Sequence, residues 1–200
     1  VTAGNLVVAT AAAVKDPITT LDTVADNKGN GNYTIQENDA LDNQVRLAQA
    51  YKENVGTGGT SFTVTATYAA TVNGTVGLLE YSSIDATPTV ISVSSTGSST
   101  APNSGTLNPT VSSIVVAVTT YNDTARTIAV NDANYTQQLE IDENNDTQAQ
   151  NIAHRLTTTG SQSCTWSLSA TATWVAHAVA YEEAATGVVR VGRLMLMGVQ

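Results

Sequence analysis

Side chains able to perform nucleophilic chemistry are scarce in this sequence. It contains one cysteine, Cys164, and two histidines, His154 and His177. A nucleophilic hydrolase needs an activated serine or cysteine with a base in reach, and the Gly-x-Ser-x-Gly turn that presents such a serine does not occur. His177 stands alone in an alternating segment, so we interpret it as a partly buried strand residue, and Cys164 as a small packed hydrophobic residue. The sequence therefore predicts a protein that is not an enzyme.

Acidic residues provide the candidate metal site. They form one group in each half of the chain: Glu37, Asp39 and Asp42 in the first, and Glu140, Asp142, Glu143 and Asp146 in the second. Oxygen-rich turns can bind Ca²⁺, and the repetition supports such a site. The ligand spacing of an EF-hand is missing, however, and acidic hairpin tips are usually only solvated. We predict no metal and no cofactor, with calcium at the second group as the alternative.

Two kinds of carbohydrate site can be considered from the sequence, a catalytic one and a binding one. A glycosidase needs two carboxylates roughly 5–10 Å apart in a cleft, and nothing in the spacing selects a pair. A sugar-binding site would use exposed aromatic rings, whose flat apolar faces stack on sugars. Tyr33 and Tyr135 recur beside turns and are candidates for that role. Tyrosines of β-sandwiches usually anchor hairpin ends instead, and we favour this interpretation.

The composition indicates strands and disfavours some classes of partner. Charged residues make up 12% of the 200 residues, and the net charge is −9. Threonine, which is abundant, suits the pleated surface of a strand. Phosphate binding needs clustered Lys and Arg, whereas the eight basic residues are scattered. We therefore expect no nucleic-acid partner. We also expect no membrane, because an acidic surface repels anionic lipids and no run of about 20 apolar residues occurs.

An internal repeat divides the chain. Five segments of the first half recur in the same order in the second: Asn5–Thr10 as Ser113–Val118, Asn32–Thr34 as Asn134–Thr136, Phe62–Thr67 as Trp166–Thr171, Glu80–Tyr81 as Ala180–Tyr181, and Thr89–Val93 as Val188–Val191. Self-similarity in a fixed order is typical of duplicated structural units. We predict two units, residues 1–100 and 109–200. The joint Ser94–Asn108 is rich in Ser, Thr, Gly and Pro, and we expect the linker at 101–108.

Each predicted unit consists of short strands. Residues of Phe62–Tyr68 alternate between apolar and threonine, which predicts a strand with one face in the core. Leu6–Ala13 is apolar on both faces, as in a strand covered on both sides. Further strands are expected at Gln44–Tyr51 and Thr75–Ser82, with a helix over Ala40–Lys52 as the alternative to the former. The predicted core consists of Phe62, Val64, Ala66, Tyr68 and Leu78 in the first unit and Trp166, Leu168, Ala170, Ala172, Trp174 and Val179 in the second.

Turn residues and strand ends resemble those of a known family. The segments concerned are Val1–Leu6, the Asp26–Gly31 turn and Leu79–Asp85. This pattern resembles a family of Thr/Ser/Gly-rich β-sandwich repeats found in bacterial secreted proteins and phage genomes. Six or seven strands per unit is also the spacing of a sandwich. We therefore expect an all-β fold of two tandem, internally duplicated β-sandwich units, jelly-roll or Ig-like. The resemblance further implies an external setting, on a virion surface or extracellular.

The C-terminal segment is the predicted assembly contact. Val188–Val191 would complete the second unit by analogy with Thr89–Val93. The chain then continues with four apolar residues that would make a strand apolar on both faces: Leu194, Met195, Leu196 and Met197. An exposed apolar edge strand favours aggregation. The segment therefore either packs between the two units or pairs with a neighbouring subunit by strand addition, and the second alternative is our hypothesis.

These observations predict a non-enzymatic structural protein on the exterior of a particle or cell. The leading interpretation is a phage virion component, such as a capsid decoration or fibre-associated protein. Its partners would be copies of itself or capsid and fibre proteins. A secreted or cell-surface adhesion module that binds glycans is the alternative, and an enzyme domain is the third.

Overall fold

The fold is all-β. The computed structural model describes residues 1–14, 20–42, 44–122, 126–142, 148–184 and 191–198. These residues form antiparallel strands and contain no helix, so none of them belongs to a helix long and apolar enough to cross a membrane. Val45–Lys52 is a strand, and the alternative of a helix over Ala40–Lys52 is therefore wrong.

The described strands fall into two series of seven. The first series is β1 (Leu6–Val14), β2 (Leu21–Asp26), β3 (Thr34–Leu41), β4 (Val45–Lys52), β5 (Val64–Tyr68), β6 (Asn73–Tyr81) and β7 (Val90–Ser99). The second is β8 (Ser113–Asn122), β9 (Ile128–Val130), β10 (Thr136–Asp142), β11 (Gln148–Thr158), β12 (Trp166–Leu168), β13 (Ala172–Glu182) and β14 (Val191–Gly198).

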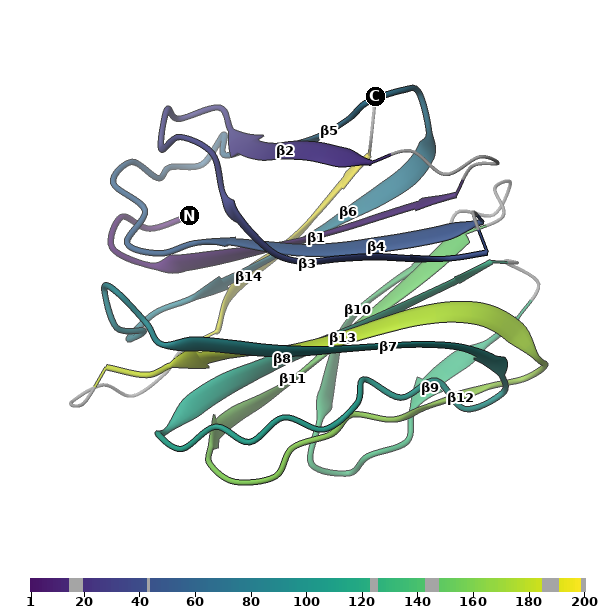
Figure 1. Ribbon diagram of the computed structural model, residues 1–200. Helices are drawn as coiled ribbons and strands as arrows, with labels where there is room; N and C mark the ends of the chain where they lie inside the picture. The colour runs from purple at the N-terminus through teal and green to yellow at the C-terminus, as the bar shows by residue number, and fades with distance from the viewer. Residues whose placement is uncertain (15–19, 43, 123–125, 143–147, 185–190, 199–200) are drawn as a thin grey trace.

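The strands make four stacked layers (Figure 1). A small sheet of β2 and β5 covers the first large sheet, which has the order β14-β6-β1-β4-β3. A second large sheet, with the order β10-β11-β8-β13-β7, packs against the inner face of the first. A small sheet of β9 and β12 covers its outer face. Each unit thus has one large and one small sheet.

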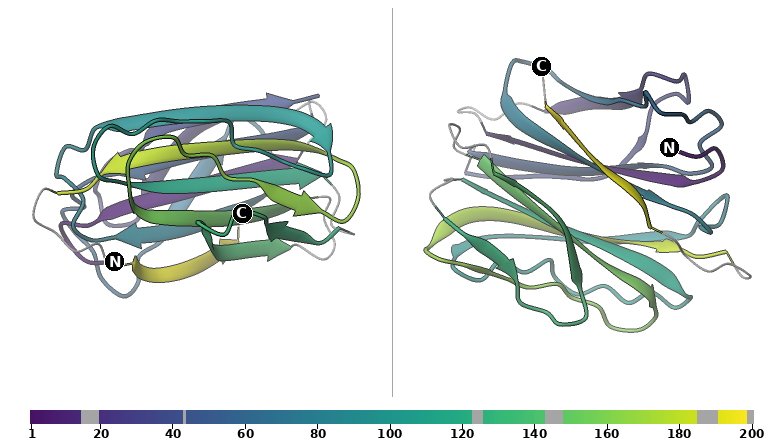
Figure 2. Two further views of the ribbon diagram at one scale, coloured as in Figure 1. Left: turned by 90° about the horizontal axis from the view of Figure 1, so that it is seen from below. Right: turned by 180° about the vertical axis from the view of Figure 1, so that it is seen from behind.

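The two units share one strand order but exchange their last strands. Replacing β1–β6 by β8–β13 converts the order of the first large sheet into that of the second. The seventh strands are the exception, because β7 pairs with β13 and β14 pairs with β6. Seen from behind, β14 lies along the first large sheet although it is the last strand of the chain (Figure 2).

The expectation that Thr89–Val93 completes the first unit and Val188–Val191 the second is therefore wrong where the structure describes these segments, and residues 188–190 lie outside the described residues. β7 pairs with β13 along its whole length, from Val90 opposite Tyr181 to Ser99 opposite Ala172. An edge strand needs only a free backbone edge of matching geometry, and both large sheets offer the same edge. The alternation of side chains along β7 therefore does not predict which of the two sheet edges this strand pairs with.

The joint between the units is also more ordered than a free linker. Its first part, Ser94–Ser99, belongs to β7. Backbone hydrogen bonds join Pro102 and Leu107 to the second unit. The Trp166 amide donates to the Pro102 carbonyl at 3.0 Å, and the amides of Leu107 and Gln162 each donate to the carbonyl of the other. The segment after β7 therefore packs on the second unit.

β1 and β8 lie in the middle of the stack, which explains their apolar character on both faces. In β1, Val7, Ala9 and Ala11 pack under the small β2–β5 sheet. Leu6 and Val8 face the other way, into the layer between the two large sheets. The prediction that Leu6–Ala13 is covered on both sides is confirmed, because a central strand with sheets on both faces buries every side chain.

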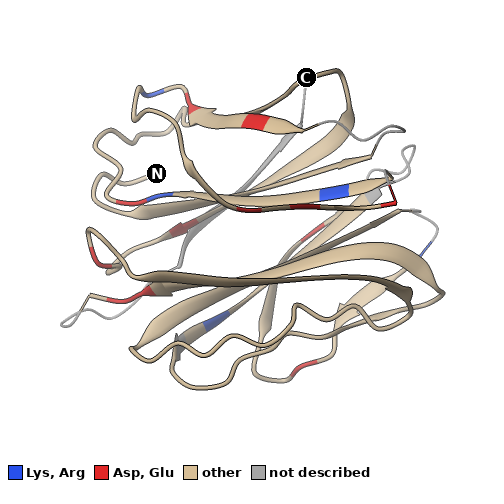
Figure 3. Ribbon diagram, viewed as in Figure 1, with Lys and Arg blue, Asp and Glu red and all other residues tan. Residues whose placement is uncertain are grey.

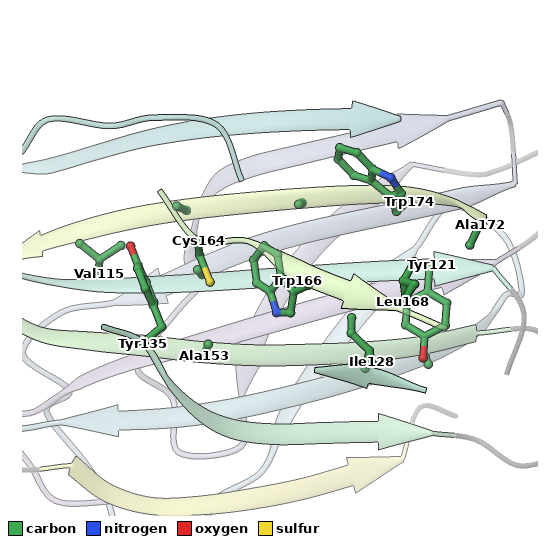
Figure 4. Packing of buried hydrophobic residues seen from close by; sticks show 14 of the residues in the cluster. Val115, Tyr121, Ile128, Tyr135, Ala153, Cys164, Trp166, Leu168, Ala172 and Trp174 are labelled. Carbon is green, nitrogen blue, oxygen red and sulfur yellow. The ribbon is translucent and has the colours of Figure 1, made fainter. Parts of the chain in front are cut away.

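The predicted core residues are buried with two exceptions. Phe62, Val64 and Ala66 lie inside the first unit, while Thr65 and Thr67 on the opposite face are exposed. In the second unit Trp166, Leu168 and Trp174 pack with Cys164 between the second large sheet and β12 (Figure 4). Tyr68 is only half-buried. Ala170 is exposed because β12 ends at Leu168, so its predicted inward orientation is wrong.

Candidate functional site

A β-bulge in β3 directs two carboxylates toward the second unit. Ile35 pairs with Ala50 and Glu37 with Gln49, so Gln36 is an extra residue in the ladder. Ile35 packs on the outer side of the first large sheet. The extra residue reverses the alternation, so Glu37 and Asp39 share the inner face with Leu41, which packs between the large sheets.

His177 reaches the same place from the second large sheet. On β13, Trp174, Ala176 and Ala178 face the small β9–β12 sheet. The intervening positions Val175 and Val179 face the first large sheet, and His177 lies between them in this alternation. Because β13 is a central strand, the His177 side chain is fully buried, with 0% of its surface exposed.

The three side chains converge at the junction of the two units. Nε2 of His177 lies 3.2 Å from Oδ2 of Asp39. One nitrogen of His177 and one carboxylate oxygen each from Glu37 and Asp39 all lie within 4.8 Å of one another. β3 packs against β7 and β13 at this point, and Gln36 donates a hydrogen bond of 3.1 Å to Ser92 on β7. We call Glu37, Asp39 and His177 the junction cluster.

Three polar atoms of the junction cluster lack a hydrogen-bond partner within the described part of the chain. Both ring nitrogens of His177 are buried without a hydrogen-bond partner, and so is Oδ2 of Asp39, because the 3.2 Å contact is not aligned as a hydrogen bond. An unsatisfied buried polar group costs about 1–3 kcal/mol. The Asp39 side chain is 38% exposed, so the cluster opens to solvent on the carboxylate side.

The electrostatics of the cluster favour a negatively charged Asp39. Close contact with the His177 ring is the main cause that lowers the pKa of the Asp39 carboxyl below its usual value. Burial opposes this shift, and the hydroxyl of Ser94 on β7 reinforces it. The acidic residues of β3 lie next to the basic residues of β4 (Figure 3). Arg46 of β4 donates a hydrogen bond of 2.6 Å to Asn38, whose side chain points to the opposite face of β3 from that of Asp39. The site therefore presents negative charge around one buried imidazole.

The equivalent position on the other side of the stack has neither the histidine nor the two acids. Thr10 on β1 pairs with Gly77, and its counterpart Val118 on β8 pairs with His177. By the same registers, Leu139 and Ile141 of β10 correspond to Glu37 and Asp39. Where one unit has histidine and two acids, the other has glycine, leucine and isoleucine. The fold is therefore compatible with apolar residues at these positions and does not itself require the polar ones.

The predicted calcium ligands are placed only in part. Glu140 is exposed on β10, where Oε2 accepts a hydrogen bond of 3.1 Å from Gln137. The side chain of Asp142 and the residues Glu143 and Asp146 lie outside the described residues. In the first unit the matching group separates, because Asp42 lies in the exposed β3–β4 turn with φ of 55°. Only Glu37 and Asp39 of that group join the junction cluster.

The tyrosines considered for sugar stacking do not offer exposed rings. Tyr33 and Tyr135 are 4% and 6% exposed. Each lies in the connection from a strand of a small sheet to a strand of a large sheet, directly before β3 or β10. The Tyr33 hydroxyl is 3.3 Å from Asp26, and the Tyr135 amide donates to the Asp132 carbonyl. Their arrangement is that of turn anchors, as we favoured.

The remaining candidates are buried or paired. Cys164 is a free thiol buried among apolar side chains, and burial raises its pKa, which makes it a poor nucleophile. The His154 ring contacts the Tyr81 hydroxyl rather than an acid. Residues 194–197 lie in β14, which pairs with β6 of the same chain, so one edge of the proposed assembly strand is used within the molecule.

One surface pocket of about 260 Å³ lies beside β5, lined by residues 65–68 and 70–72. Its walls are threonine, alanine and valine, with Tyr68 as the titratable group, and burial raises the pKa of that phenol. A pocket of this lining offers hydroxyls and methyl groups but no acid–base pair. We therefore take the junction cluster as the candidate functional site.

Comparisons with known proteins return no relative. No family model matches the chain, and neither a curated protein nor a solved structure is significantly similar to it.

Sequence reasoning named every member of the junction cluster but did not bring them together. The sequence groups Glu37 and Asp39 with Asp42, and it presents His177 as a lone residue. One signal was available, because His177 aligns with Gly77 in the repeat. A polar residue in an otherwise apolar central strand needs a partner across the layer, and the acids of the edge strand were the candidates nearby.

Proposed function

We propose that this protein is a non-enzymatic structural protein on the exterior of a particle or cell, and specifically a phage virion component such as a capsid decoration or fibre-associated protein. The observation that carries the proposal is the reciprocal exchange of β7 and β14 between the two units. A protein of this kind must keep its shape outside the cell, and the exchange makes two small units into one body.

The energetic reason lies in the ladders that the exchange creates. Separating the units requires breaking the β7–β13 ladder, the β14–β6 ladder and the apolar layer that contains Leu47, Ile114 and Ile152. The chain has one cysteine, so this cohesion is obtained without an internal disulfide. Unfolding must break several ladders at once, which raises its activation barrier. This barrier sets how long the native protein persists outside a cell, where no chaperone refolds it.

The surface offers strand edges for assembly. In each large sheet the outermost strands leave a backbone edge unpaired in the described part of the chain, on β3 and β14 in one and on β7 and β10 in the other. Edge strands can add a strand from a neighbouring molecule. The edge of β14, which contains residues 194–197, is our proposed contact with another subunit or with a capsid or fibre protein.

We also propose that the two units arose by duplication of one β-sandwich unit of jelly-roll or Ig-like type. The shared order of β1–β6 and β8–β13 supports this origin, and so does the β-bulge at the same place in β3 and β10. The exchange of the seventh strands would then have followed the duplication, since it needs both edges in one chain.

Gold labelling with antibodies against the purified protein tests the location. Intact phage particles and intact cells from the source would be labelled and compared with the same samples after lysis. We expect label on the outside of intact virions. Label on intact cell surfaces would favour the adhesion module, which a glycan array would then examine. Label that appears only inside lysed cells would contradict the proposal.

A further inference from the structure

We propose that Glu37, Asp39 and His177 form a binding site for a divalent first-row transition-metal cation, which ties the first unit to the second. The cation would bridge β3 of the first large sheet and β13 of the second. This inference is independent of the proposed location of the protein, because it rests on the geometry of the junction cluster alone.

The donor atoms are already close to the spacing that such an ion requires. With metal–ligand distances of about 2.1 Å, neighbouring ligand atoms lie about 3.4 Å apart in a tetrahedral site. His177 Nε2 and Asp39 Oδ2 are 3.2 Å apart, and no pair of the three donors exceeds 4.8 Å. A rotation of the Glu37 side chain, which lies at the half-buried edge of the sheet, can close the remaining gap.

The burial of His177 is independent evidence that a cation binds here. Its ring is completely buried, and neither nitrogen has a hydrogen-bond partner among the described residues, although Nε2 points at Asp39. Buried polar groups almost always have a partner. A neutral imidazole nitrogen is a strong metal ligand, so a cation between Nε2 and the carboxylates would satisfy both His177 and Oδ2 of Asp39.

The donor set selects the class of ion. Calcium and magnesium take oxygen ligands, whereas one imidazole with two carboxylates suits Zn²⁺, Mn²⁺, Co²⁺ or Ni²⁺. Two carboxylates neutralise the charge of a divalent ion. Because the Asp39 side chain is 38% exposed, the ion could enter from solvent and keep a water in its remaining coordination positions.

The repeat provides an internal comparison. At the equivalent position Gly77 leaves room for Ile152, and a β-carbon added there would lie 2.4 Å from the end of that side chain. Leu139 and Ile141 stand where Glu37 and Asp39 stand in the first unit. At that junction Ile152 and the buried hydrogen bond between Thr10 and Gln150 fill the space beside Gly77. The metal would fill the corresponding place beside His177.

Thermal unfolding of the chelator-treated protein with added ZnCl₂ tests the proposal. A ligand that binds only the native state raises Tm by mass action, and for this chain length we expect about 5–10 °C at a zinc concentration one hundred times the Kd. Titration calorimetry should give one zinc ion per chain. Calcium at the same concentration should leave Tm unchanged.

Three variants and a control locate the ion. Glu37→Gln and Asp39→Asn keep side-chain shape and should each weaken zinc binding at least tenfold, and His177→Gln should abolish it. Glu140→Gln removes an exposed carboxylate from β10 and should bind zinc as the unaltered protein does. Since Glu37 and Asp39 lie at the edge of the sheet, their variants keep the test valid even if His177→Gln fails to fold.

The two histidines give a direct spectroscopic readout. The ¹⁵N resonances of the His177 ring should shift on zinc addition, while those of His154 stay unchanged. The proposal is overturned if none of the four transition-metal ions binds up to about 1 mM, a Kd that corresponds to only about −4 kcal/mol. It is equally overturned if Asp39→Asn binds zinc as tightly as the unaltered protein, or if His154 responds instead of His177.

Discussion

The hydroxyl of Tyr81 lies 3.0 Å from Nδ1 of His154, and this buried contact joins the two units. The equivalent residues on the other side of the stack are Tyr181 and Tyr51, whose rings meet edge to face with centroids 5.3 Å apart. In each case the tyrosine of the sixth strand contacts an aromatic residue of the fourth strand in the other unit. The layer between the large sheets is thus built from matching pairs.

Burial of His154 predicts a stability that depends on pH. Burial lowers the pKa of His154 to about 4, whereas in the unfolded chain it titrates near 6.5. Between these values the unfolded chain binds more protons than the native protein. The free energy of unfolding should therefore fall as pH decreases from about 6.5 to about 4, by at most about 1.4 kcal/mol per pH unit from this group.

Urea unfolding of the unaltered protein and of His154→Gln across this pH range measures the effect. Glutamine keeps an acceptor for the Tyr81 hydroxyl but does not titrate. The stability difference between the two proteins should shrink as pH falls. Because both retain His177, its contribution cancels, and parallel pH profiles would show that His154 is not responsible.

Trp166 should contribute strongly to the core of the second unit. It is 1% exposed, and its indole nitrogen donates a hydrogen bond of 3.0 Å to Asn151 on β11. Trp166→Ala should lower the free energy of unfolding by about 3–5 kcal/mol, because it leaves a large cavity. Trp166→Phe, which keeps most of the volume and loses the hydrogen bond, should cost less. A loss below 1 kcal/mol for the alanine variant in denaturant unfolding would contradict this role.

The exchanged strand β7 should be sensitive at Gly97. A β-carbon there would lie 2.6 Å from the indole of Trp174, which itself donates a hydrogen bond to Ser99. Gly97→Val should destabilise the protein by about 1–3 kcal/mol through overpacking. Thr96→Val, at the exposed neighbouring position, is the control and should change stability by less than about 0.5 kcal/mol. Equal effects of the two substitutions would mean that β7 does not dock closely on β13.

Deletion of residues 194–200 should destabilise the first unit rather than only prevent assembly. It removes most of β14 and leaves the β6 edge unpaired from Leu78 to Thr75. An uncovered edge next to a buried strand exposes apolar surface and favours aggregation. We expect a lower Tm and concentration-dependent light scattering. A truncated protein of unchanged Tm that stays monomeric would show that β14 is dispensable for folding and would restore a pure assembly role.

The strand exchange predicts a single unfolding transition for both units. Neither large sheet is complete without a strand of the other half, so partial unfolding of one unit would remove an edge from the other. Scanning calorimetry should give a calorimetric enthalpy equal to the van't Hoff enthalpy. Two resolved peaks would show that the units unfold independently despite the exchange.

The sequence by itself determined the local structure. Residues Phe62–Tyr68 alternate between apolar and polar because one face of the segment is covered, and β1 is apolar on both faces because both are covered. The order of residue types along the chain shows such periodicity directly. The repeat also predicted that the two halves would have the same strand order, which β1–β6 and β8–β13 confirm.

Only the tertiary structure decided which sheet each final strand joins and which polar residues meet. β7 and β14 present the same backbone pattern to either large sheet, so their choice depends on the stacking of the units and the path between them. Glu37 and His177 are 140 positions apart, and the bulge at Gln36 decides that the acid faces the imidazole. Contacts across a layer between two sheets follow from stacking and register, which residue periodicity along one strand does not encode.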